Sequence, residues 1–231
     1  MCTELDAEYF FLNCLITGPW SSSIPSSPYL ENVTYSLTVP STLTDYDTTD
    51  TSLWVAIWMG VQPNSDDYNS AALVQPILNW CNDQEDCGCP AAADEWCFTT
   101  TMYYESGQEG SAYVAVATGS ILDFAIYVSG DSIVQTVSQD GEILSQRSDD
   151  VFYPGVFYGA NECSSTPACG TLPSYTWSNI TMTFSEAVTD LGTYIEGLNS
   201  TWTTPVSTQD GKVWTWDGIT IEAQATGTWT S

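Results

Sequence analysis

The run LWVAIWM, Leu53–Met59, is apolar at every position. Successive side chains of a β-strand point to opposite faces of the sheet, so this run predicts a central strand that is covered on both faces. The segments on either side of it also have strand character. Tyr35–Val39 alternates between polar and apolar residues and stops at Pro40, and the largely apolar run Ala71–Trp80 follows.

Short strand-like runs continue to the end of the chain, and Asp140-Gly141 marks a hairpin turn between two of them. Only residues 186–198 have helical spacing, with Val188, Leu191, Ile195 and Leu198 on one side, which predicts one short helix or a loop. The remaining predicted strands are Trp96–Glu105, Tyr113–Ala117, Phe124–Val128, Ile133–Val137, Ile143–Leu144, Val151–Tyr158, Tyr175–Phe184, Val213–Trp216 and Ile219–Ala223.

This pattern predicts an all-β fold, a two-sheet antiparallel β-sandwich or jelly roll. No internal repeat and no linker divides the chain. We therefore expect a single sandwich domain over residues 31–231, with residues 1–30 as a disulfide-tied N-terminal arm packed on it.

The charge of the chain is strongly one-sided. Its 231 residues include 29 acidic residues, only two basic ones (Arg147 and Lys212) and no histidine, which gives a net charge of −27 at pH 7. Without a cluster of cations the chain cannot bind a nucleic-acid backbone, and an anionic membrane is an unfavourable partner. Acid relieves the self-repulsion by protonating carboxylates, and salt or calcium relieves it by screening. We favour acid, and the sequence leaves both open.

The cysteines and the glycosylation sequons indicate an oxidising, secretory compartment. The sequons begin at Asn32, Asn179 and Asn199. No signal peptide is visible and no apolar run reaches membrane-spanning length, so we expect a mature, secreted, extracellular chain. We expect disulfides Cys2–Cys14 and Cys163–Cys169 and two more among Cys81, Cys87, Cys89 and Cys97, whose pairing the spacing leaves open.

The residue types that are missing exclude several kinds of chemistry. Without histidine there is no Ser-His-Asp or Cys-His site, and oxidised cysteines supply no thiol nucleophile. The acidic loop Asn82–Asp86 does not match the spacing of an EF-hand, and the disulfides occupy the cysteines, so we expect no metal and no cofactor. Carboxylate, amide and phenol groups remain, and they suit acid–base hydrolysis or plain binding.

The stretch ALVQPILNW, Ala72–Trp80, places an amide within an apolar strand. By alternation, Val74, Leu78 and Trp80 face the core, whereas Gln75 and Asn79 lie on the outer face. In Trp96–Glu105 the same alternation directs Thr99, Thr101, Tyr103 and Glu105 outward. If the two strands pair, Gln75 and Glu105 form a plausible hydrolytic pair, in which the carboxylate activates water and the amide donates to the developing oxyanion.

Four landmarks, SLWVAI (Ser52–Ile57), ALVQPILNW (Ala72–Trp80), MYYE (Met102–Glu105) and GDSIVQTV (Gly130–Val137), occur in the order found in the fungal glutamic peptidases, the eqolisins. The chain resembles that family over roughly residues 30–190. The resemblance implies a secreted, acid-acting enzyme with a concanavalin-like (lectin-like) β-sandwich and a catalytic glutamine and glutamate. Gln75 then matches the catalytic glutamine, and Glu105 matches a glutamate near the site.

The catalytic glutamate of that family belongs to a later strand. The matching stretch here, VFYPGVFYGANE (Val151–Glu162), has glycine, tyrosine or an apolar residue at the corresponding position. Its one carboxylate, Glu162, lies several residues further on. A bulge or a shift of register would be needed to bring it into that role.

The leading hypothesis is an acid-active hydrolase related to glutamic endopeptidases, with catalytic groups among Gln75, Glu105 and Glu162. Asn79, Tyr103 and Trp58 are the expected substrate contacts. The alternative is a non-catalytic secreted sandwich that binds glycans or has a structural role, and a polysaccharide-degrading enzyme is a third, weaker hypothesis. The partner is accordingly a polypeptide or a glycan, and the oligomeric state stays open.

Overall fold

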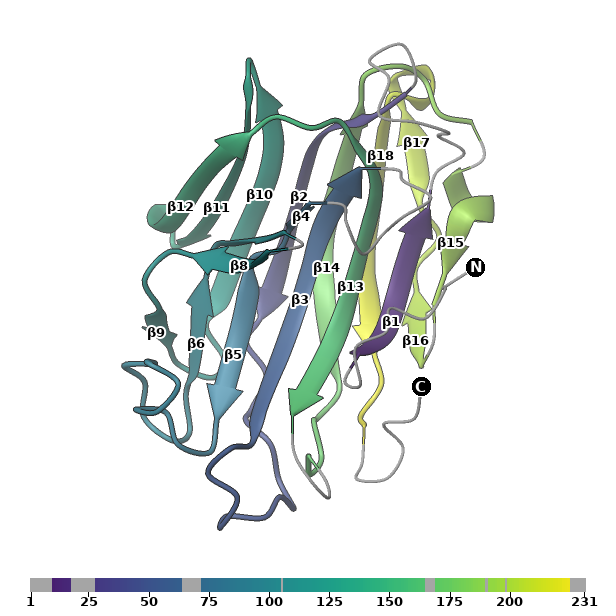
Figure 1. Cartoon of the computed structure of the whole chain (residues 1–231). Helices are drawn as coiled ribbons and strands as arrows, with labels where there is room; N and C mark the ends of the chain where they lie inside the picture. The colour runs from purple at the N-terminus through teal and green to yellow at the C-terminus, as the bar shows by residue number, and fades with distance from the viewer. Residues whose placement is uncertain are drawn as a thin grey trace.

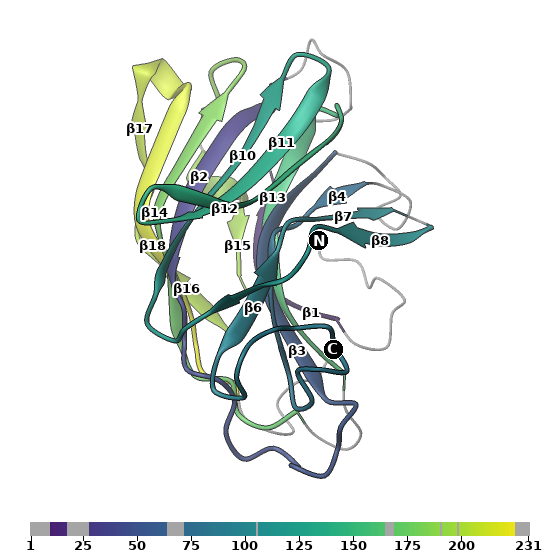
Figure 2. The same cartoon turned by 90° about the vertical axis from the view of Figure 1, so that its left-hand side faces the viewer.

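The computed structural model describes residues 10–17, 28–63, 72–104, 106–164, 169–189, 191–197 and 199–224. Two antiparallel sheets pack face to face, as Figure 1 shows from the front and Figure 2 from the side. The predicted all-β sandwich is therefore confirmed. We call the ten-stranded sheet, which contains β3, sheet A, and the eight-stranded sheet, which contains β2, sheet B.

Sheet A contains the predicted central strand and the first described strand of the chain. The segment Phe10–Thr17, expected in an arm, forms β1 and is hydrogen-bonded into this sheet between β13 and β15. The order is β15 (Ile195–Glu196), β1 (Phe10–Thr17), β13 (Pro154–Ser164), β3 (Trp54–Pro63), β4 (Leu73–Val74), β7 (Thr101–Tyr104) and β8 (Gly107–Gly110), with β5 (Ile77–Cys81) on β3, β6 (Trp96–Thr99) on β5 and β9 (Val114–Val116) on β6.

Sheet B extends to both sides of the strand that follows residue 29. Its order is β12 (Glu142–Asp150), β11 (Ser132–Gln139), β10 (Ile121–Ser129), β2 (Leu30–Thr38), β14 (Tyr175–Phe184), β18 (Val213–Ile221) and β16 (Ser200–Trp202), with β17 (Val206–Thr208) on β18. The turn Asp140-Gly141 joins β11 to β12 with φ of 53° and 82°, which confirms the predicted hairpin. In its described part the stretch 186–198 forms one 3₁₀ turn, η1 (Leu191–Tyr194), followed by the short strand β15, and η2 (Gln209–Gly211) is a second short turn.

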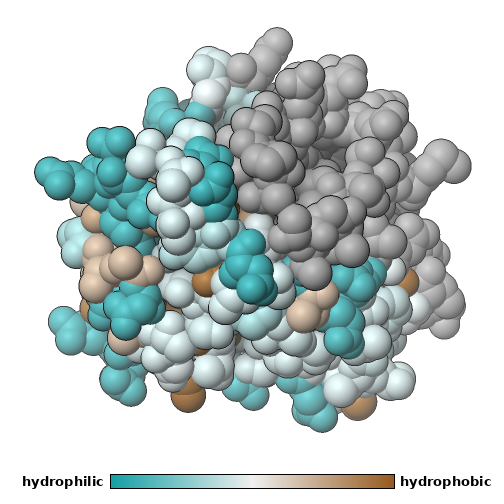
Figure 3. Space-filling view, turned by 90° about the horizontal axis from the view of Figure 1, so that it is seen from below, coloured by the Kyte–Doolittle hydropathy of each residue, from teal (hydrophilic) through white to brown (hydrophobic). Residues whose placement is uncertain are grey.

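Strand β3 is buried on both faces, as its sequence predicts. Val55, Ile57 and Met59 belong to the main core between the sheets. Ala56 and Trp58 belong to a second apolar cluster on the opposite, outer face of sheet A. The other buried members of this outer cluster are Leu73, Ile77, Val156, Tyr158 and Ala160. Seen from below, the coloured surface residues are mostly hydrophilic or intermediate, and strongly hydrophobic residues are exposed in only a few places (Figure 3).

A bulge in β14 changes which of its side chains face the core. The pairing of β14 with β2 shifts between Ser178 and Thr181, and Asn179 has a left-handed φ of 53°. Trp177 on one side of the bulge and Ile180 on the other are therefore both buried in the core. Strict alternation along Tyr175–Phe184 would place Tyr175 and Trp177 on the outer face with Asn179. Because of the bulge both rings are buried, whereas Asn179 is exposed.

Three disulfides are present in the described part of the chain. Cys163–Cys169 confirms the prediction, and the pairings left open by spacing are Cys81–Cys87 and Cys89–Cys97. The expected Cys2–Cys14 bridge lies outside the described residues because Cys2 does. Among the residues described, no helix is long and apolar enough to cross a membrane.

Gly60 allows β3 to approach the chain that follows β4. A Cβ atom at this position would collide with the carbonyl oxygen of Val74 and lie 3.1 Å from the Cα of Gln75. We expect Gly60→Ala to lower the free energy of unfolding by about 1–3 kcal/mol, because backbone atoms must move to admit the methyl group. Gly192→Ala is the control, since nothing lies within 4 Å of its Cβ position. Urea unfolding of both variants checks this, and equal stabilities would contradict it.

Candidate functional site

A groove of about 460 Å³ opens on the outer face of sheet A, and we call it the sheet A groove. It is built from β3, β5, β6, β7, β8 and β13, with Ser111 and Tyr113 from the connection between β8 and β9. Glu162 is the one carboxylate among its lining residues in the described chain. The lining residues are Trp54, Ala56, Ile77, Asn79, Cys81, Cys87, Thr99, Thr101, Gln108, Gly110, Ser111, Tyr113 and Glu162.

The pairing of three strands places Glu162 and Asn79 on either side of a small residue. Ala56 of β3 is paired with Glu162 of β13 on one side and with Asn79 of β5 on the other. Neighbouring strands lie about 4.8 Å apart, so the backbones at Glu162 and Asn79 are separated by roughly 10 Å. The methyl group of Ala56 leaves the space between the two polar side chains open, and a ligand can lie between them.

Glu162 is held by a tryptophan and has a perturbed pKa. The indole Nε1 of Trp58 donates a hydrogen bond of 2.5 Å to Oε1 of Glu162. Burial disfavours the carboxylate and raises its pKa to about 7, although the bond from Trp58 acts in the opposite direction. Because an indole N–H can only donate, Oε1 is fixed as an acceptor, so the proton of the neutral acid resides on Oε2. Glu162 is thus a carboxylic acid at acidic pH.

Asn79 orients a phenol on the other side of the groove. Its Nδ2 donates a hydrogen bond of 2.5 Å to the hydroxyl oxygen of Tyr113. Burial raises the pKa of Tyr113, so this phenol keeps its proton. Since the hydroxyl oxygen accepts from Asn79, its O–H is directed away from Asn79 and can donate to a ligand. Tyr113 was not among the residues singled out from the sequence, where it only begins a short predicted strand.

Gln75 lies on the predicted face but not in the groove. Its backbone N–H donates to the carbonyl of Thr101 at 3.0 Å, and the Thr101 hydroxyl donates back to the carbonyl of Gln75 at 2.6 Å. The side chain is 4 % exposed, and its Oε1 has no hydrogen-bond partner among the residues that the structure describes. Continuing the register from the Val61–Val74 pair places Gln75 opposite Gly60.

The residue across Gly60 from Gln75 is a tyrosine. Tyr158 of β13 pairs with Gly60, and its hydroxyl donates to Oε1 of Gln62 at 2.7 Å. In this row of the sheet a phenol therefore stands where a carboxylate would be needed to work with Gln75. Glu162 is four residues further along β13. This carboxylate is therefore level with Asn79, across Ala56, and not with Gln75.

The other three expected site residues, the contacts Trp58 and Tyr103 and the catalytic candidate Glu105, lie outside the groove lining or outside the described residues. Trp58 is 2 % exposed, packs edge-on against Tyr158 with ring centroids 5.2 Å apart and bonds Glu162, but it does not line the groove. Tyr103 is 38 % exposed on β7, outside the groove lining. Glu105 lies outside the described residues. Of the expected site residues, the groove brings together Glu162 and Asn79.

One wall of the groove is the hairpin β7–β8, which is fastened to sheet B by charged groups. Arg147 of β12 donates from Nε to both oxygens of Asp149 at 2.9 Å and from Nη2 to Oε2 of Glu109 on β8 at 2.9 Å. The hydroxyl of Tyr104 on β7 donates to Asp149 at 3.3 Å. These contacts link both strands of the hairpin to the edge of the other sheet.

Buried polar contacts fasten the same hairpin from inside the sandwich. Nε2 of Gln135, on β11, donates to the carbonyl of Thr101 at 2.8 Å. The hydroxyl of Thr100 lies 3.0 Å from that of Ser145 and donates to that of Ser111 at 2.9 Å. Among the residues that the structure describes, no group of three or more His, Cys, Asp or Glu side chains could hold a metal ion.

Comparison with known proteins shows the fold and no family. No family model matches the chain, and no curated protein matches its sequence. The structure is similar to that of scytalido-glutamic peptidase with a transition-state analogue inhibitor, with a TM-score of 0.56 and 13 % identity over 91 % of this chain and 98 % of that one. This likeness supports the sandwich architecture.

Two further solved structures are matched with lower TM-scores. Bacillus licheniformis β-glucanase has a TM-score of 0.34 and 10 % identity, over 90 % of this chain and 76 % of that one. Congerin II, liganded with lactose and MES, has a TM-score of 0.29 and 12 % identity, over 63 % of this chain and 94 % of that one.

The raised pKa of Glu162 predicts a pH-dependent stability difference. Between about pH 4.5 and 7 the unfolded chain ionises Glu162 while the folded chain holds its proton, so the wild type loses stability as the pH rises. Above pH 7 the loss is complete and amounts to on the order of 3 kcal/mol. Glu162→Gln stays neutral, so we expect its stability relative to the wild type to rise by this amount between pH 4 and pH 8.

Urea unfolding of both proteins at the two pH values measures this difference. Glu222→Gln, at an exposed position, controls for the loss of one negative charge. A difference between wild type and Glu162→Gln that does not change with pH would show that the carboxyl is not desolvated.

Arg147 is expected to hold the groove wall in place. Arg147→Met removes the ion pairs to Glu109 and Asp149 but retains much of the side-chain length, so amide hydrogen exchange in 101–110 should accelerate by tenfold or more. Lys212→Met changes the net charge equally at an exposed position and should leave exchange in this hairpin unchanged. Equal protection in the two variants would rule out the role of Arg147.

Proposed function

We propose that the chain is an acid-acting hydrolase that cleaves peptide bonds in the sheet A groove, with Glu162 as the group that transfers protons. One observation carries the proposal: a carboxyl with a pKa raised to about 7 lines an open groove and is oriented by Trp58. Strongly perturbed carboxyls in grooves are typical of catalytic sites. By analogy with scytalido-glutamic peptidase, whose fold is similar, we take a polypeptide as the substrate.

The neutral acid suggests the order of proton transfers. Oε2 of Glu162 donates its proton to the carbonyl oxygen of the peptide bond while a water molecule bonds to the carbonyl carbon. The excess proton of that water passes to the Glu162 carboxylate, which gives a tetrahedral diol. Glu162 then protonates the amide nitrogen, the C–N bond breaks, and the remaining diol proton returns to Glu162, which leaves an acid and an amine.

Asn79 and Tyr113 complete the arrangement on the opposite side of Ala56. The hydroxyl of Tyr113, held by Asn79, would donate a hydrogen bond to an oxygen of the neutral diol and so hold the diol in the groove. In this proposal Tyr113 donates the hydrogen bond to the reacting oxygen that the sequence analysis assigned to Gln75. Gln75 remains a candidate for supporting the site through its backbone bonds to Thr101, and Glu105 remains a proposed accessory carboxylate.

The setting is proposed to be secreted and acidic. Three disulfides fit an oxidising compartment. Acid would protonate Glu162 and also reduce the self-repulsion of a chain with a net charge of −27 at neutral pH. Both effects favour activity below pH 7.

Incubation with a denatured polypeptide at pH 3–6, followed by mass spectrometry of the fragments, tests the proposal. We expect cleavage by the wild type, a rate that falls as the pH rises through about 7, and a loss of at least about 100-fold in Glu162→Gln. Glu222→Gln should retain the wild-type rate. Absence of cleavage, or full activity of Glu162→Gln, would refute the proposal, and Gln75→Ala in the same assay decides whether Gln75 takes part.

Binding of glycans without catalysis is the second candidate. The groove is lined by hydroxyl and amide side chains together with the ring of Trp54, a set that suits the hydroxyls and apolar faces of sugars. A glycan array at acidic and neutral pH, compared with the Asn79→Ala variant, tests it. Binding that depends on Asn79 with no peptide cleavage would favour this candidate over the hydrolase.

A further inference from the structure

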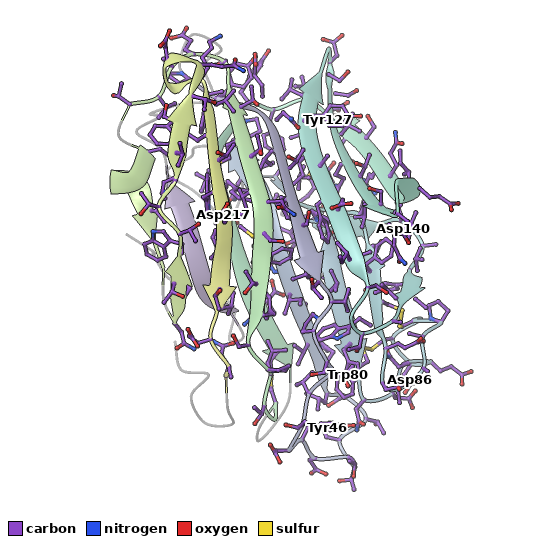
Figure 4. The ribbon with its side chains drawn as sticks, turned by 180° about the vertical axis from the view of Figure 1, so that it is seen from behind. Tyr46, Trp80, Asp86, Tyr127, Asp140 and Asp217 are labelled. Atoms are coloured by element: carbon purple, nitrogen blue, oxygen red, sulfur yellow. A yellow bond between two sulfur atoms is a disulfide. The ribbon has the colours of Figure 1, made fainter. Side chains whose placement is uncertain are left out.

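A second hollow, of about 660 Å³, lies on the face of sheet B that points away from sheet A, and we call it the Asn32 hollow. Asn32 of β2 lies directly between Tyr127 of β10 and Thr183 of β14 in the register. The next row on this face contains Thr34 and Ala125, which are paired with each other and are short. The short side chains of this row, next to the larger ones of the row of Asn32, leave the hollow open. Figure 4 shows Tyr127 on this side of the molecule.

The hollow contains both functional residues of a glycosylation sequon. Asn32 and Thr34 are the first and third residues of Asn-Val-Thr, so alternation puts them on the same, partly exposed face, while Val33 between them is fully buried in the core. The core therefore holds the strand in place, and the acceptor amide opens onto a hollow that already has an aromatic ring beside it. The other two sequon asparagines, Asn179 and Asn199, are exposed and do not belong to this hollow.

We propose that Asn32 carries an N-linked oligosaccharide whose first sugars lie in the Asn32 hollow against the ring of Tyr127. The sugars come from a lipid-linked oligosaccharide pyrophosphate during secretion. A bond forms between Nδ2 of Asn32 and C1 of the first sugar, and the bond from C1 to the pyrophosphate oxygen breaks. Nδ2 loses a proton to the surrounding water, and the lipid pyrophosphate leaves as an anion.

The chemistry of the hollow suits this occupant. The ring of Tyr127 presents an apolar surface to one face of a pyranose ring. The carboxylate of Glu31 and the hydroxyls of Tyr29 and Thr34 line the same hollow and can bond sugar hydroxyls. The volume is within the range of sites that hold small ligands. Because the hollow is on sheet B and the groove is on sheet A, this inference is independent of the proposed function.

The test uses the full chain produced in a eukaryotic secretory host. Glycopeptide mass spectrometry measures the occupancy of Asn32, and thermal unfolding measures the coupling between the glycan and Tyr127. We expect an occupied Asn32, and we expect Tyr127→Ala to lower Tm by about 2–4 °C more in the glycosylated protein than in an Asn32→Gln background. Tyr127→Phe retains the ring and should retain the coupling.

Asn199→Gln is the matched control, because it removes a sequon outside the hollow and should leave the effect of Tyr127→Ala unchanged. If Asn32→Gln is not secreted, enzymatic removal of the glycan from the folded wild type and from Tyr127→Ala provides the same comparison. An unoccupied Asn32 overturns the proposal. An occupied Asn32 with strictly additive Tm changes shows that the glycan projects into solvent, which overturns its placement in the hollow.

Discussion

Strand β3 must be buried on both faces, and this constraint governs both the fold and the chemistry of the protein. Its inward side chains join the main core, and its outward side chains require an apolar surface on the far side of sheet A. An acid that is placed in this surface loses its hydration. Glu162 is such an acid: it is paired with Ala56 across the strand boundary and bonded to Trp58 two residues away along β3. The pKa of Glu162 is therefore raised because the outer face of β3, like its inner face, is largely buried.

Much of the fold could be predicted because alternation is a local property. The segregation of Val74, Leu78 and Trp80 to the core and of Leu73 and Ile77 to the outer face follows directly from the period of two. The period fails at Asn179, where one residue with positive φ adds a bulge and turns Trp177 inward. Asparagine is one of the residues that tolerate a left-handed φ, but an asparagine in a strand sequence does not by itself predict a bulge.

The site could be predicted only in part. Alternation predicts the face of the sheet on which a side chain lies, but it predicts neither which residues of the neighbouring strands lie beside it nor whether other side chains bury it. Gln75 lies on the expected face and yet is buried, and the residue that β13 contributes to its row, across Gly60, is Tyr158. Asn79, predicted merely as a contact, shares its row with the carboxylate. This distinction depends on the register between β3, β5 and β13, which are separated by long stretches of sequence. Tyr113 could not be found for the same reason, since it reaches Asn79 from a connection 34 residues away.

The scarcity of basic residues limits how proteases of the trypsin type can digest the protein. Proteases of the trypsin type cleave after lysine or arginine, and this chain of 231 residues offers them only Arg147 and Lys212. Arg147 lies within β12, its side chain is 18 % exposed, and its guanidinium is engaged by two carboxylates. A bound arginine in a paired strand is a poor substrate, because cleavage requires an extended and accessible backbone. Digestion by such enzymes is thereby nearly confined to one bond, the one that follows Lys212.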